Sequence, residues 1–438
     1  MSKVYKPSPI SGFPEYLPEI RAVEQRWIDH IRKVFESYGF CNIETPAVEE
    51  VEVLMAKGET DKEIYSLKRL QADPKDTSDS RLALRFDQTV PLARYTAQHF
   101  NELVFPFKRY QIQKVWRGER PQVGREREFY QCDIDVLAVD NLPLHFDAEM
   151  PAVVYEALMG LDIGKVLIKI SNRKILIGLL ATLNIDDVVA TTRIIDKLDK
   201  IGEDGVRKLL SEEVGISDQH ITSLLALSTI KTRSAVELRA ALEALGVENE
   251  LFQEGLNELC FVLDYLAHMP EGSIIADLSI VRGLDYYTGT VYETNLLEIP
   301  EFTSSVCSGG RYDDLASSYI NKKLPGVGIS IGLTRLFSVL LENGYIKAGA
   351  KSPADILMVI PSEERRKKAQ ETAQELRARG FKVELYHAAQ KIQKQMTYAK
   401  KKSIAYVWFP PFEDGAAHEV KNMDSGEQVE TTTESFTL

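Results

Sequence analysis

Two runs of alternating polar and apolar residues, at positions 107–117 and 128–137, constrain the fold most. Alternation at every second residue predicts β-strands, and the loop between them, with one proline and two glycines, predicts an antiparallel hairpin. The polar residues of one face would then be neighbours across the two strands. They are Arg109, Gln111, Gln113 and Arg117 on the first strand and Gln131, Asp133 and Asp135 on the second.

A strand face that carries arginines beside carboxylates can bind a polyphosphate and a zwitterion side by side. The loop of this hairpin adds Arg120, Arg125 and Arg127, which its turn residues hold outward. A hairpin whose polar face meets water presents the same pattern. The hairpin alone therefore does not distinguish a binding site from an ordinary polar surface.

Three later segments favour a ligand site. Residues 280–294 combine an arginine with an aspartate–tyrosine cluster, which is dense in hydrogen-bonding groups. In residues 307–313, CSGGRYD, a glycine pair allows the backbone to approach a ligand closely. Residues 325–341 run from a glycine-spaced strand into an apolar helix with Arg335 in its first turn. A cation beside the free amides of a helix start favours phosphate.

Together these segments resemble the histidyl-tRNA synthetases, a family of class II aminoacyl-tRNA synthetases. VWRGE with GREREFYQCDID resembles the second signature motif of the class, GLTRLF the third, and NIETPAVEEVEVLM the weaker first motif, whose proline (Pro46) belongs to the dimer interface in that class. RGLDYY and SGGRYD resemble the two peptides of the histidine-specific enzymes, and LRFDQTVPLARY fits their histidine-binding loop. The resemblance extends from about Phe13 to the C-terminus, apart from an intervening helical stretch.

The resemblance implies a histidine–tRNA ligase. Such an enzyme activates L-histidine with ATP and Mg²⁺, releases pyrophosphate, and passes histidine to the 3′-terminal adenosine of tRNA(His). Positioned arginines and magnesium can supply this catalysis without a protein nucleophile or a metal site built by protein alone. The family also implies a cytoplasmic homodimer that acts without DNA or a membrane.

The resemblance assigns roles to particular residues, for each of which a structural ion pair is the alternative. Arg117 would contact the α-phosphate, Arg335 the γ-phosphate, and Arg282 the region of the carboxylate and α-phosphate. The implied catalytic residues are Arg117, Arg282 and Gln131, and the implied ATP site is Arg117, Glu119, Arg125 and Arg335. The implied histidine site is Asp87, Thr89, Gln131, Asp135, Arg282, Tyr286, Tyr287 and Tyr312.

Two of these positions depart from a pattern common in bacterial members, which carry glutamate where this chain has Asp87 and Asp135. The carboxylate is retained, but its reach is one methylene shorter. Backbone position or water must compensate.

Composition and charge fit a soluble, cytoplasmic protein. Hydrophobic residues make up 44% of the chain, and no apolar run approaches the roughly 18 residues of a membrane span. The N-terminus is neither a signal peptide nor an obvious transit peptide. The four cysteines form no CxxC pair, so we expect reduced thiols without disulfides or structural zinc.

A net charge of −12 argues against a generally basic nucleic-acid binder, although such footprints are local. The C-terminal segment is neutral by comparison and contains a lysine cluster. A solubilising helix face explains the cluster without the family resemblance, whereas the resemblance favours contact with RNA. The residues implied in tRNA binding are Arg120, Arg127, Lys391, Lys394, Lys400 and Lys401.

The pattern along the chain predicts an α+β catalytic core, with a mostly antiparallel sheet flanked by helices, in two parts at 1–172 and 269–343. A helical insertion at 173–268, separate from the sheet, interrupts it. A linker at 344–353 leads to a C-terminal α/β domain at 354–438, for which strands alternating with helices predict a largely parallel sheet. The resemblance makes this the anticodon-binding domain, and its polar tail is expected to be frayed.

A rival interpretation comes from catalytically inactive paralogues of this family. They are regulatory subunits of the ATP phosphoribosyltransferase of histidine biosynthesis, and they sense histidine without needing tRNA. Such paralogues typically lack the C-terminal domain and the ATP-binding arginines. This chain retains both, so the sequence favours the ligase.

Overall fold

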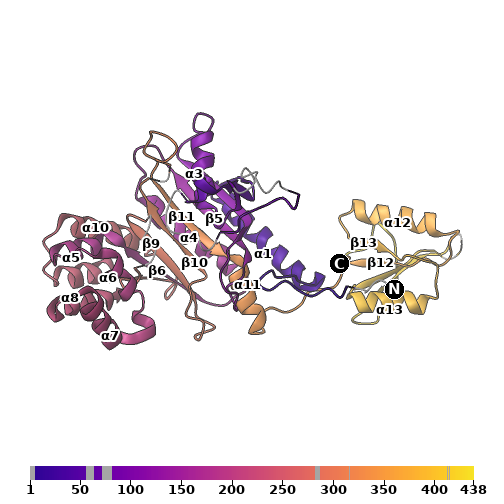
Figure 1. Ribbon diagram of the computed structural model, residues 1–438. Coiled ribbons are helices and arrows are strands. Elements are labelled where there is room, and N and C mark those ends of the chain that lie inside the picture. Colours follow the sequence, from indigo (N-terminus) through magenta and orange to yellow (C-terminus); the bar gives the residue numbers. More distant parts are fainter. Residues whose placement is uncertain are drawn as a thin grey trace. The chain divides into compact units, whose positions relative to one another are not determined.

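The chain forms two compact units (Figure 1). The larger unit contains the residues up to Pro14 together with 27–346, and the smaller one contains residues 15–26 and 347–438. The computed structural model describes residues 5–55, 64–71, 81–281, 287–314, 316–411, 413 and 415–438.

Within the described residues, the larger unit is built on a sheet of nine strands in the order β1-β4-β5-β11-β10-β9-β6-β8-β7. The pairs β1–β4 and β6–β8 are parallel and the other neighbours are antiparallel, which confirms the predicted α+β class. The strands are β1 (Cys41–Asn42), β4 (Phe107–Trp116), β5 (Glu128–Leu137), β6 (Val166–Asn172), β7 (Lys231–Thr232), β8 (Ile274–Asp277), β9 (Thr290–Leu296), β10 (Cys307–Tyr312) and β11 (Gly326–Gly332).

Helices flank this sheet and supply its core. The predicted amphipathic helix is α1 (Pro18–Ser37), whose Trp27 packs edge-on against Phe337 of α11 (Leu333–Glu342) at 5.2 Å between ring centroids. Helix α4 (His145–Met159) packs against β11, so its buried side chains cover the sheet face away from the polar residues of the hairpin. The pair β2 (Val48–Glu50) and β3 (Leu82–Leu84), with α2 (Val51–Met55), leads into α3 (Thr89–Gln98).

Between β6 and β8 the chain forms a helical segment (Figure 1). Asparagine, aspartate or serine caps begin several of its helices by accepting hydrogen bonds from free amides. The segment was expected to stay separate from the sheet, but its β7 pairs with β8 and extends the sheet by one edge strand. Its helices are α5 (Arg173–Thr182), α6 (Val188–Ile195), α7 (Leu198–Leu209), α8 (Asp218–Ser228), α9 (Ala235–Glu243) and α10 (Glu250–Tyr265).

The smaller unit contains a five-stranded sheet in the order β13-β12-β14-β15-β16, counted over its described residues. Strands β13, β12 and β14 are parallel, but β15 and β16 are antiparallel, so the prediction of a largely parallel sheet is only half right. Antiparallel strands need only a short connection, whereas parallel ones need a crossover helix. The elements are β12 (Ile356–Met358), α12 (Arg366–Ala378), β13 (Val383–Leu385), α13 (Ile392–Lys402), β14 (Tyr406–Phe409), β15 (His418–Asn422) and β16 (Gln428–Thr431).

The C-terminal tail is packed rather than frayed. Phe436 is 6% exposed, and its ring lies 5.4 Å from the ring of Trp408. The Arg379 guanidinium donates to the Phe436 carbonyl at 2.9 Å. One aromatic side chain in a polar tail is enough to anchor it, and the expected fraying is therefore wrong. No described helix is both long and apolar enough to cross a membrane.

Candidate active site

The hairpin predicted from the sequence is formed by β4 and β5. Its register sets Arg109 opposite Asp135, and Gln113 opposite Gln131, so the predicted polar face exists. Strand β11 pairs with the other edge of β5 and sets Gly328 opposite Asp135. The ends of β10 and β11 thus complete one polar surface on the sheet.

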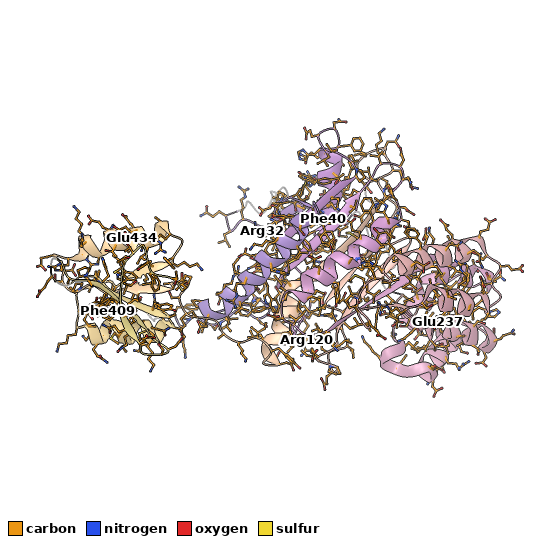
Figure 2. The ribbon with its side chains drawn as sticks, turned by 180° about the vertical axis from the view of Figure 1, so that it is seen from behind. Arg32, Phe40, Arg120, Glu237, Phe409 and Glu434 are labelled. Atoms are coloured by element: carbon orange, nitrogen blue, oxygen red, sulfur yellow. The ribbon has the colours of Figure 1, made fainter. Side chains whose placement is uncertain are left out.

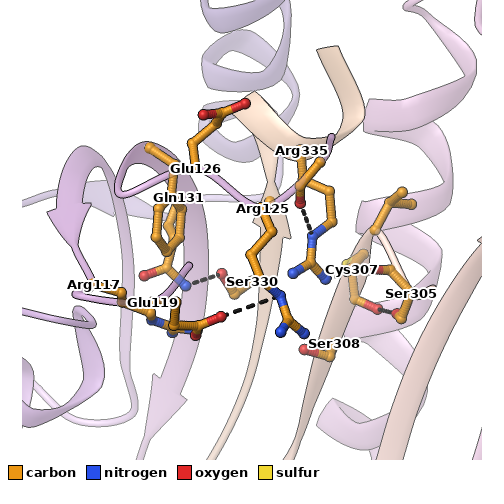
Figure 3. A pocket seen from close by; sticks show the side chains of 14 residues that line it. Arg117, Glu119, Arg125, Glu126, Gln131, Ser305, Cys307, Ser308, Ser330 and Arg335 are labelled. Atoms are coloured by element: carbon orange, nitrogen blue, oxygen red, sulfur yellow. Dashed lines mark hydrogen bonds and ion pairs between the residues drawn. The ribbon is translucent and has the colours of Figure 1, made fainter. Parts of the chain in front are cut away.

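Two cavities that share part of their lining open on this surface. The first, here called the arginine cavity, is lined by Arg117, Glu119, Gly124, Arg125, Glu126, Phe129, Gln131, 305–308, Ser330, Gly332 and Arg335 (Figure 3). The second, the acidic cavity, is lined by Phe86, Asp87, Thr89, Arg117, Gln131, Asp133, Asp135, Tyr287, Ser308, Tyr312 and 328–330. Arg117, Gln131, Ser308 and Ser330 line both.

Backbone carbonyls orient the two main cations of the arginine cavity. Arg335 donates from Nε to the Gly124 carbonyl at 2.7 Å and from Nη1 to the Ser305 carbonyl at 2.9 Å. Arg117 donates from Nε to the Phe86 carbonyl at 3.1 Å, and its guanidinium lies 5.2 Å from the centre of the Phe129 ring. Such contacts fix the planes of both guanidinium groups before a ligand arrives, which favours binding of an anion.

A third arginine pairs with a carboxylate at the mouth of this cavity. Arg125 Nε lies 3.1 Å from Glu119 Oε2, and the Arg125 side chain is half exposed (Figure 3). An exposed pair of this kind is weak and can open to admit a ligand. Burial, with Glu342 nearby, raises the pKa of Glu126 on the same loop.

The acidic cavity contains three aspartates, of which Asp133 and Asp135 are buried and Asp87 is partly exposed. Asp135 Oδ1 accepts a hydrogen bond from the Tyr312 hydroxyl at 2.7 Å, and its Oδ2 lies 2.6 Å from Arg109 Nη2. Asp87 Oδ1 accepts from the Val90 amide at the start of α3, at 3.1 Å. Asp133 is 3% exposed, and its Oδ1 has no hydrogen-bond partner among the described residues.

Burial disfavours the charged form of each of these carboxyls. It raises the pKa of Asp135 to about 7, although Arg109 opposes the shift. It raises the pKa of Asp87 to about 6 against the Val90 amide and Arg117, and it also raises the pKa of Asp133. The cavity is therefore poised to gain negative charge near neutral pH, as a cationic ligand would require.

Two glycines of β11 make room for these side chains. A Cβ at Gly328 would lie 2.0 Å from Asp135 Oδ1, and a Cβ at Gly326 would lie 2.3 Å from the Tyr312 ring. Both distances are far inside van der Waals contact. The glycine spacing that the sequence showed before Arg335 thus serves the acidic cavity.

The structure brings most of the predicted residues together. Arg117, Glu119, Arg125, Gln131 and Arg335 meet in the arginine cavity. Six predicted histidine-site residues meet in the acidic cavity, and Arg282 and Tyr286 lie outside the described residues. The six are Asp87, Thr89, Gln131, Asp135, Tyr287 and Tyr312.

The residues expected to contact RNA lie elsewhere. Arg120 is exposed and lines neither cavity (Figure 2). Arg127 donates from Nε to the Glu119 carbonyl at 3.0 Å, so it supports the loop. The lysines of the smaller unit are exposed, one just before α13 and the others along it; they are Lys391, Lys394, Lys400 and Lys401.

Two arginines differ from expectation. Arg311 belongs to the segment 307–313, which was expected to approach a ligand, but its Nη2 lies 2.5 Å from Asp147 Oδ2 in a buried ion pair. It alternates with Tyr312 along β10, and therefore points to the opposite face of the sheet. Arg109 received no role from the sequence, yet it is fully buried beside Asp135. Its shared parity with Gln111 was the signal that could have identified it.

Comparisons with known proteins agree with this geometry. The chain matches the family model for histidyl-tRNA synthetase over residues 12–336 and the model for an anticodon binding domain over residues 356–437. It is 56% identical to a histidine–tRNA ligase of Thermobifida fusca over 434 residues, which cover 99% of both chains. It is 48% identical to the corresponding ligase of Bifidobacterium longum, covering 97% of this chain and 95% of that one.

Solved structures resemble the chain as well. The crystal structure of histidyl-tRNA synthetase from Nostoc sp. PCC 7120 has a TM-score of 0.88 and 39% identity, and covers 99% of this chain and 98% of that one. A Bacillus halodurans protein, described as an ATP phosphoribosyltransferase regulatory subunit/histidyl-tRNA synthetase, has a TM-score of 0.74 at 21% identity, which concerns the fold alone. Two family models and near-complete coverage by these relatives lead to one conclusion: the chain belongs to the histidyl-tRNA synthetase family.

Proposed function

We propose that this chain is a histidine–tRNA ligase, which activates L-histidine with ATP and then transfers it to tRNA(His). The observation that carries the proposal is the pair of cavities on one sheet face, one rich in arginine and one in aspartate. ATP is a polyanion, whereas histidine presents an ammonium group and an N–H donor. The residues common to both cavities would lie where the two substrates meet.

In the first step a histidine carboxylate oxygen attacks the α-phosphorus, and the bond to pyrophosphate breaks. Negative charge grows on the phosphoryl oxygens, so preorganised cations lower the barrier. Arg117, which lines both cavities, would bind the α-phosphate, and Arg335 the γ-phosphate. Arg125 would exchange its partner Glu119 for phosphate or base contacts. The family resemblance adds Arg282 near the reacting carboxylate.

Magnesium would accompany ATP. Among the described residues no group of three or more histidine, cysteine, aspartate or glutamate side chains could hold a metal ion. Mg²⁺ often takes most of its ligands from phosphates and water, with one or two carboxylates, and Glu119 or Glu126 fits that part. When bound, the ion would neutralise charge on the phosphates.

Recognition of histidine would divide the acidic cavity into two ends. Asp135 and Tyr287 would hydrogen-bond the imidazole, whose neutral form has one donor and one acceptor nitrogen. Asp87, Thr89 and Gln131 would bind the α-ammonium group, while Tyr312 lines the pocket. The family resemblance adds Tyr286 to the histidine site. A ligand that lacks one of the two imidazole nitrogens would leave a group of the site without a hydrogen-bond partner. The site would therefore reject such a ligand by roughly 10⁴-fold or more.

In the second step the hydroxyl of the 3′-terminal adenosine attacks the carboxyl carbon of the adenylate, and AMP leaves. The hydroxyl proton would pass to the phosphate. Gln131 donates from Nε2 to Ser330 Oγ at 2.9 Å, while its buried Oε1 has no hydrogen-bond partner among the described residues. This oxygen would orient the hydroxyl or the ammonium group. The remaining tRNA contacts would come from Arg120, Arg127 and the lysines of the smaller unit.

The regulatory-subunit alternative is not favoured. The relatives with the higher identities reported above are ligases, and the chain carries the anticodon-binding model that such paralogues typically lack. We expect a cytoplasmic homodimer, as in the family. A monomeric mass under native conditions at micromolar concentration would contradict the dimer.

The test of the function is ATP–pyrophosphate exchange, with each of the twenty amino acids assayed separately. Exchange with histidine alone is expected, followed by charging of tRNA(His). Histidine binding without exchange would instead support the regulatory alternative. Exchange with a different amino acid would refute the assignment of the acidic cavity.

A further inference from the structure

Arg109 lies behind the acidic cavity and has no part in the function proposed above. It sits in β4 directly opposite Asp135 of β5, and its side chain is 0% exposed. Its Nη2 is 2.6 Å from Asp135 Oδ2, and its Nη1 is 3.4 Å from Gln111 Oε1. Within the parts of the chain that the structure describes, Asp135 is the one carboxylate that forms an ion pair with it.

The Arg109 guanidinium makes few hydrogen bonds for a fully buried charged group. Arg109 Nε has no hydrogen-bond partner among the described residues, and Nη2 contacts Asp135 as an ion pair without hydrogen-bond geometry. A buried charge costs several kcal/mol unless good hydrogen bonds accompany it. By comparison, the buried Arg85 makes hydrogen bonds to three backbone carbonyls. A purely structural role therefore explains Arg109 less well than a role for its charge.

Asp135 is the carboxylate that Arg109 contacts directly, although the same charge also opposes the rise in the pKa of Asp133 and Asp87. The titratable and charged groups that face it are Asp133 on its own strand, Asp87 before α3, Tyr312 of β10 and Arg109 of β4. Burial and the two other aspartates favour the protonated form of Asp135, whereas Arg109 and Tyr312 favour the carboxylate. The balance leaves its pKa at about 7, so without Arg109 this side chain would be protonated at neutral pH.

We propose that Arg109 is a positioning residue for histidine recognition: it keeps Asp135 ionised and holds one carboxylate oxygen in place, so that Asp135 accepts the imidazole N–H. The inference rests on the proposed function, because it names the residue that tunes the amino-acid cavity of the same site. The inference also explains how Asp135, which is one methylene shorter than the glutamate of many bacterial members, can act in histidine binding. The long arginine side chain reaches across from the neighbouring strand and fixes the carboxylate from behind.

The experiment measures histidine binding by calorimetry between about pH 6 and pH 9 for the parent protein and five variants. Arg109→Met should bind histidine about fivefold or more weakly at pH 7, because a rise of the Asp135 pKa by one unit or more, from about 7, lowers the ionised fraction from about half to about a tenth or less. The loss should shrink toward pH 9, where Asp135 ionises again. Arg109→Lys, which keeps the charge but not the planar group, should fall between the two. The KM for ATP in the exchange assay should stay unchanged in both.

Lys108→Met is the matched control. Lys108 is the neighbouring residue in β4, and it pairs with Glu149 on the opposite face of the sheet. Its loss also removes a cation paired with a carboxylate from this strand, and it should leave the pH profile as in the parent protein. If Arg109→Met fails to fold, Arg109→Lys and the double variant Arg109→Met/Asp135→Asn carry the test. The double variant should lose no more affinity than Asp135→Asn alone, because the two residues act as one unit.

A loss of affinity that is equal at every pH would overturn the inference, as would an unchanged profile in Arg109→Met. Additive losses in the double variant would overturn it as well. The proposed function fails separately: if the parent protein binds histidine but catalyses no exchange, the ligase assignment is lost, while the binding profiles still decide the role of Arg109. A parent protein that binds no histidine would refute both.

Discussion

The arginine cavity and the acidic cavity share four lining residues, yet the chain prepares them in opposite ways. In the arginine cavity, backbone carbonyls hold the guanidinium groups of Arg117 and Arg335 in fixed orientations. In the acidic cavity, burial raises the pKa of Asp87 to about 6 and that of Asp135 to about 7, and it also raises the pKa of Asp133. The arginine cavity therefore presents positive charges in fixed positions, whereas the acidic cavity can change its protonation when a ligand binds.

This comparison predicts the largest effect at the residue that belongs to both halves. Arg117→Ala should lower ATP–pyrophosphate exchange by about 10³-fold, because loss of one preorganised donor to developing charge costs roughly 10²–10³ and the proposed role of Arg117 includes orienting the bound ATP. Steady-state exchange measures the loss, and thermal unfolding checks that the fold survives. Near-normal activity would remove Arg117 from the site.

The next effect should separate the two halves. Asp135→Asn keeps the shape but removes the negative charge and replaces one carboxylate oxygen, the acceptor proposed for the imidazole N–H, by an NH2 donor, so the KM for histidine should rise by about 10²-fold or more. The KM for ATP should change less than threefold, since Asp135 does not line the arginine cavity. Exchange kinetics with one substrate varied at a time provide both values. Equal changes in the two KM values would show that the halves are not independent.

A change of pH should act on one half. The pKa values of Asp135 and Asp87 are about 7 and about 6, so a fall in pH from 8 to 6 protonates most of Asp135 and about half of Asp87 before histidine binds. Histidine affinity should therefore fall by up to about tenfold for each pH unit and each proton displaced. Calorimetry in two buffers of different ionisation enthalpy counts the protons released on binding. If no protons were released at pH 7, the inference that the acidic cavity loses protons when histidine binds would be contradicted.

The smallest effect concerns stability. Asp133 has a raised pKa in the folded protein, so its protonated form favours folding, and the stability this gives is lost as the pH rises through its folded pKa. At pH 8, Asp133→Asn should therefore raise the free energy of unfolding, by about 1 kcal/mol. Denaturant unfolding with and without the substitution measures it. Asp162→Asn is the control, because that exposed aspartate has a φ of 54°, which asparagine tolerates.

The fold and much of the site could be predicted from local patterns. Alternation along the hairpin is enough to place Gln131 and Asp135 on one face. The pattern of residues 325–341, which contain Arg335, predicts a strand followed by a helix. The residue that each of these side chains contacts could not be predicted from the same patterns. Which residue lies across from Asp135 depends on strand register, and a shift by one residue would turn a side chain to the other face of the sheet.

The smaller unit shows the same limit at the level of topology. Its alternating strands and helices predicted a parallel sheet, and β13, β12 and β14 form one. Whether β15 and β16 pair in parallel or antiparallel fashion depends on the length of their connections and on which side chains they bury. Phe436 packs on Trp408 because the final turns bring it there, and no local pattern in the polar tail marks that contact.

The glycines of β11 restrict how this enzyme could be redesigned for another amino acid. Binding pockets are commonly reshaped by adding bulk to the wall, but a side chain at position 328 or 326 would collide with Asp135 or Tyr312 before it reached a ligand. Libraries that diversify this strand would therefore yield inactive clones. Routes to a new substrate lead through the aspartates and tyrosines on the facing elements, and the glycine wall should be held constant while they vary.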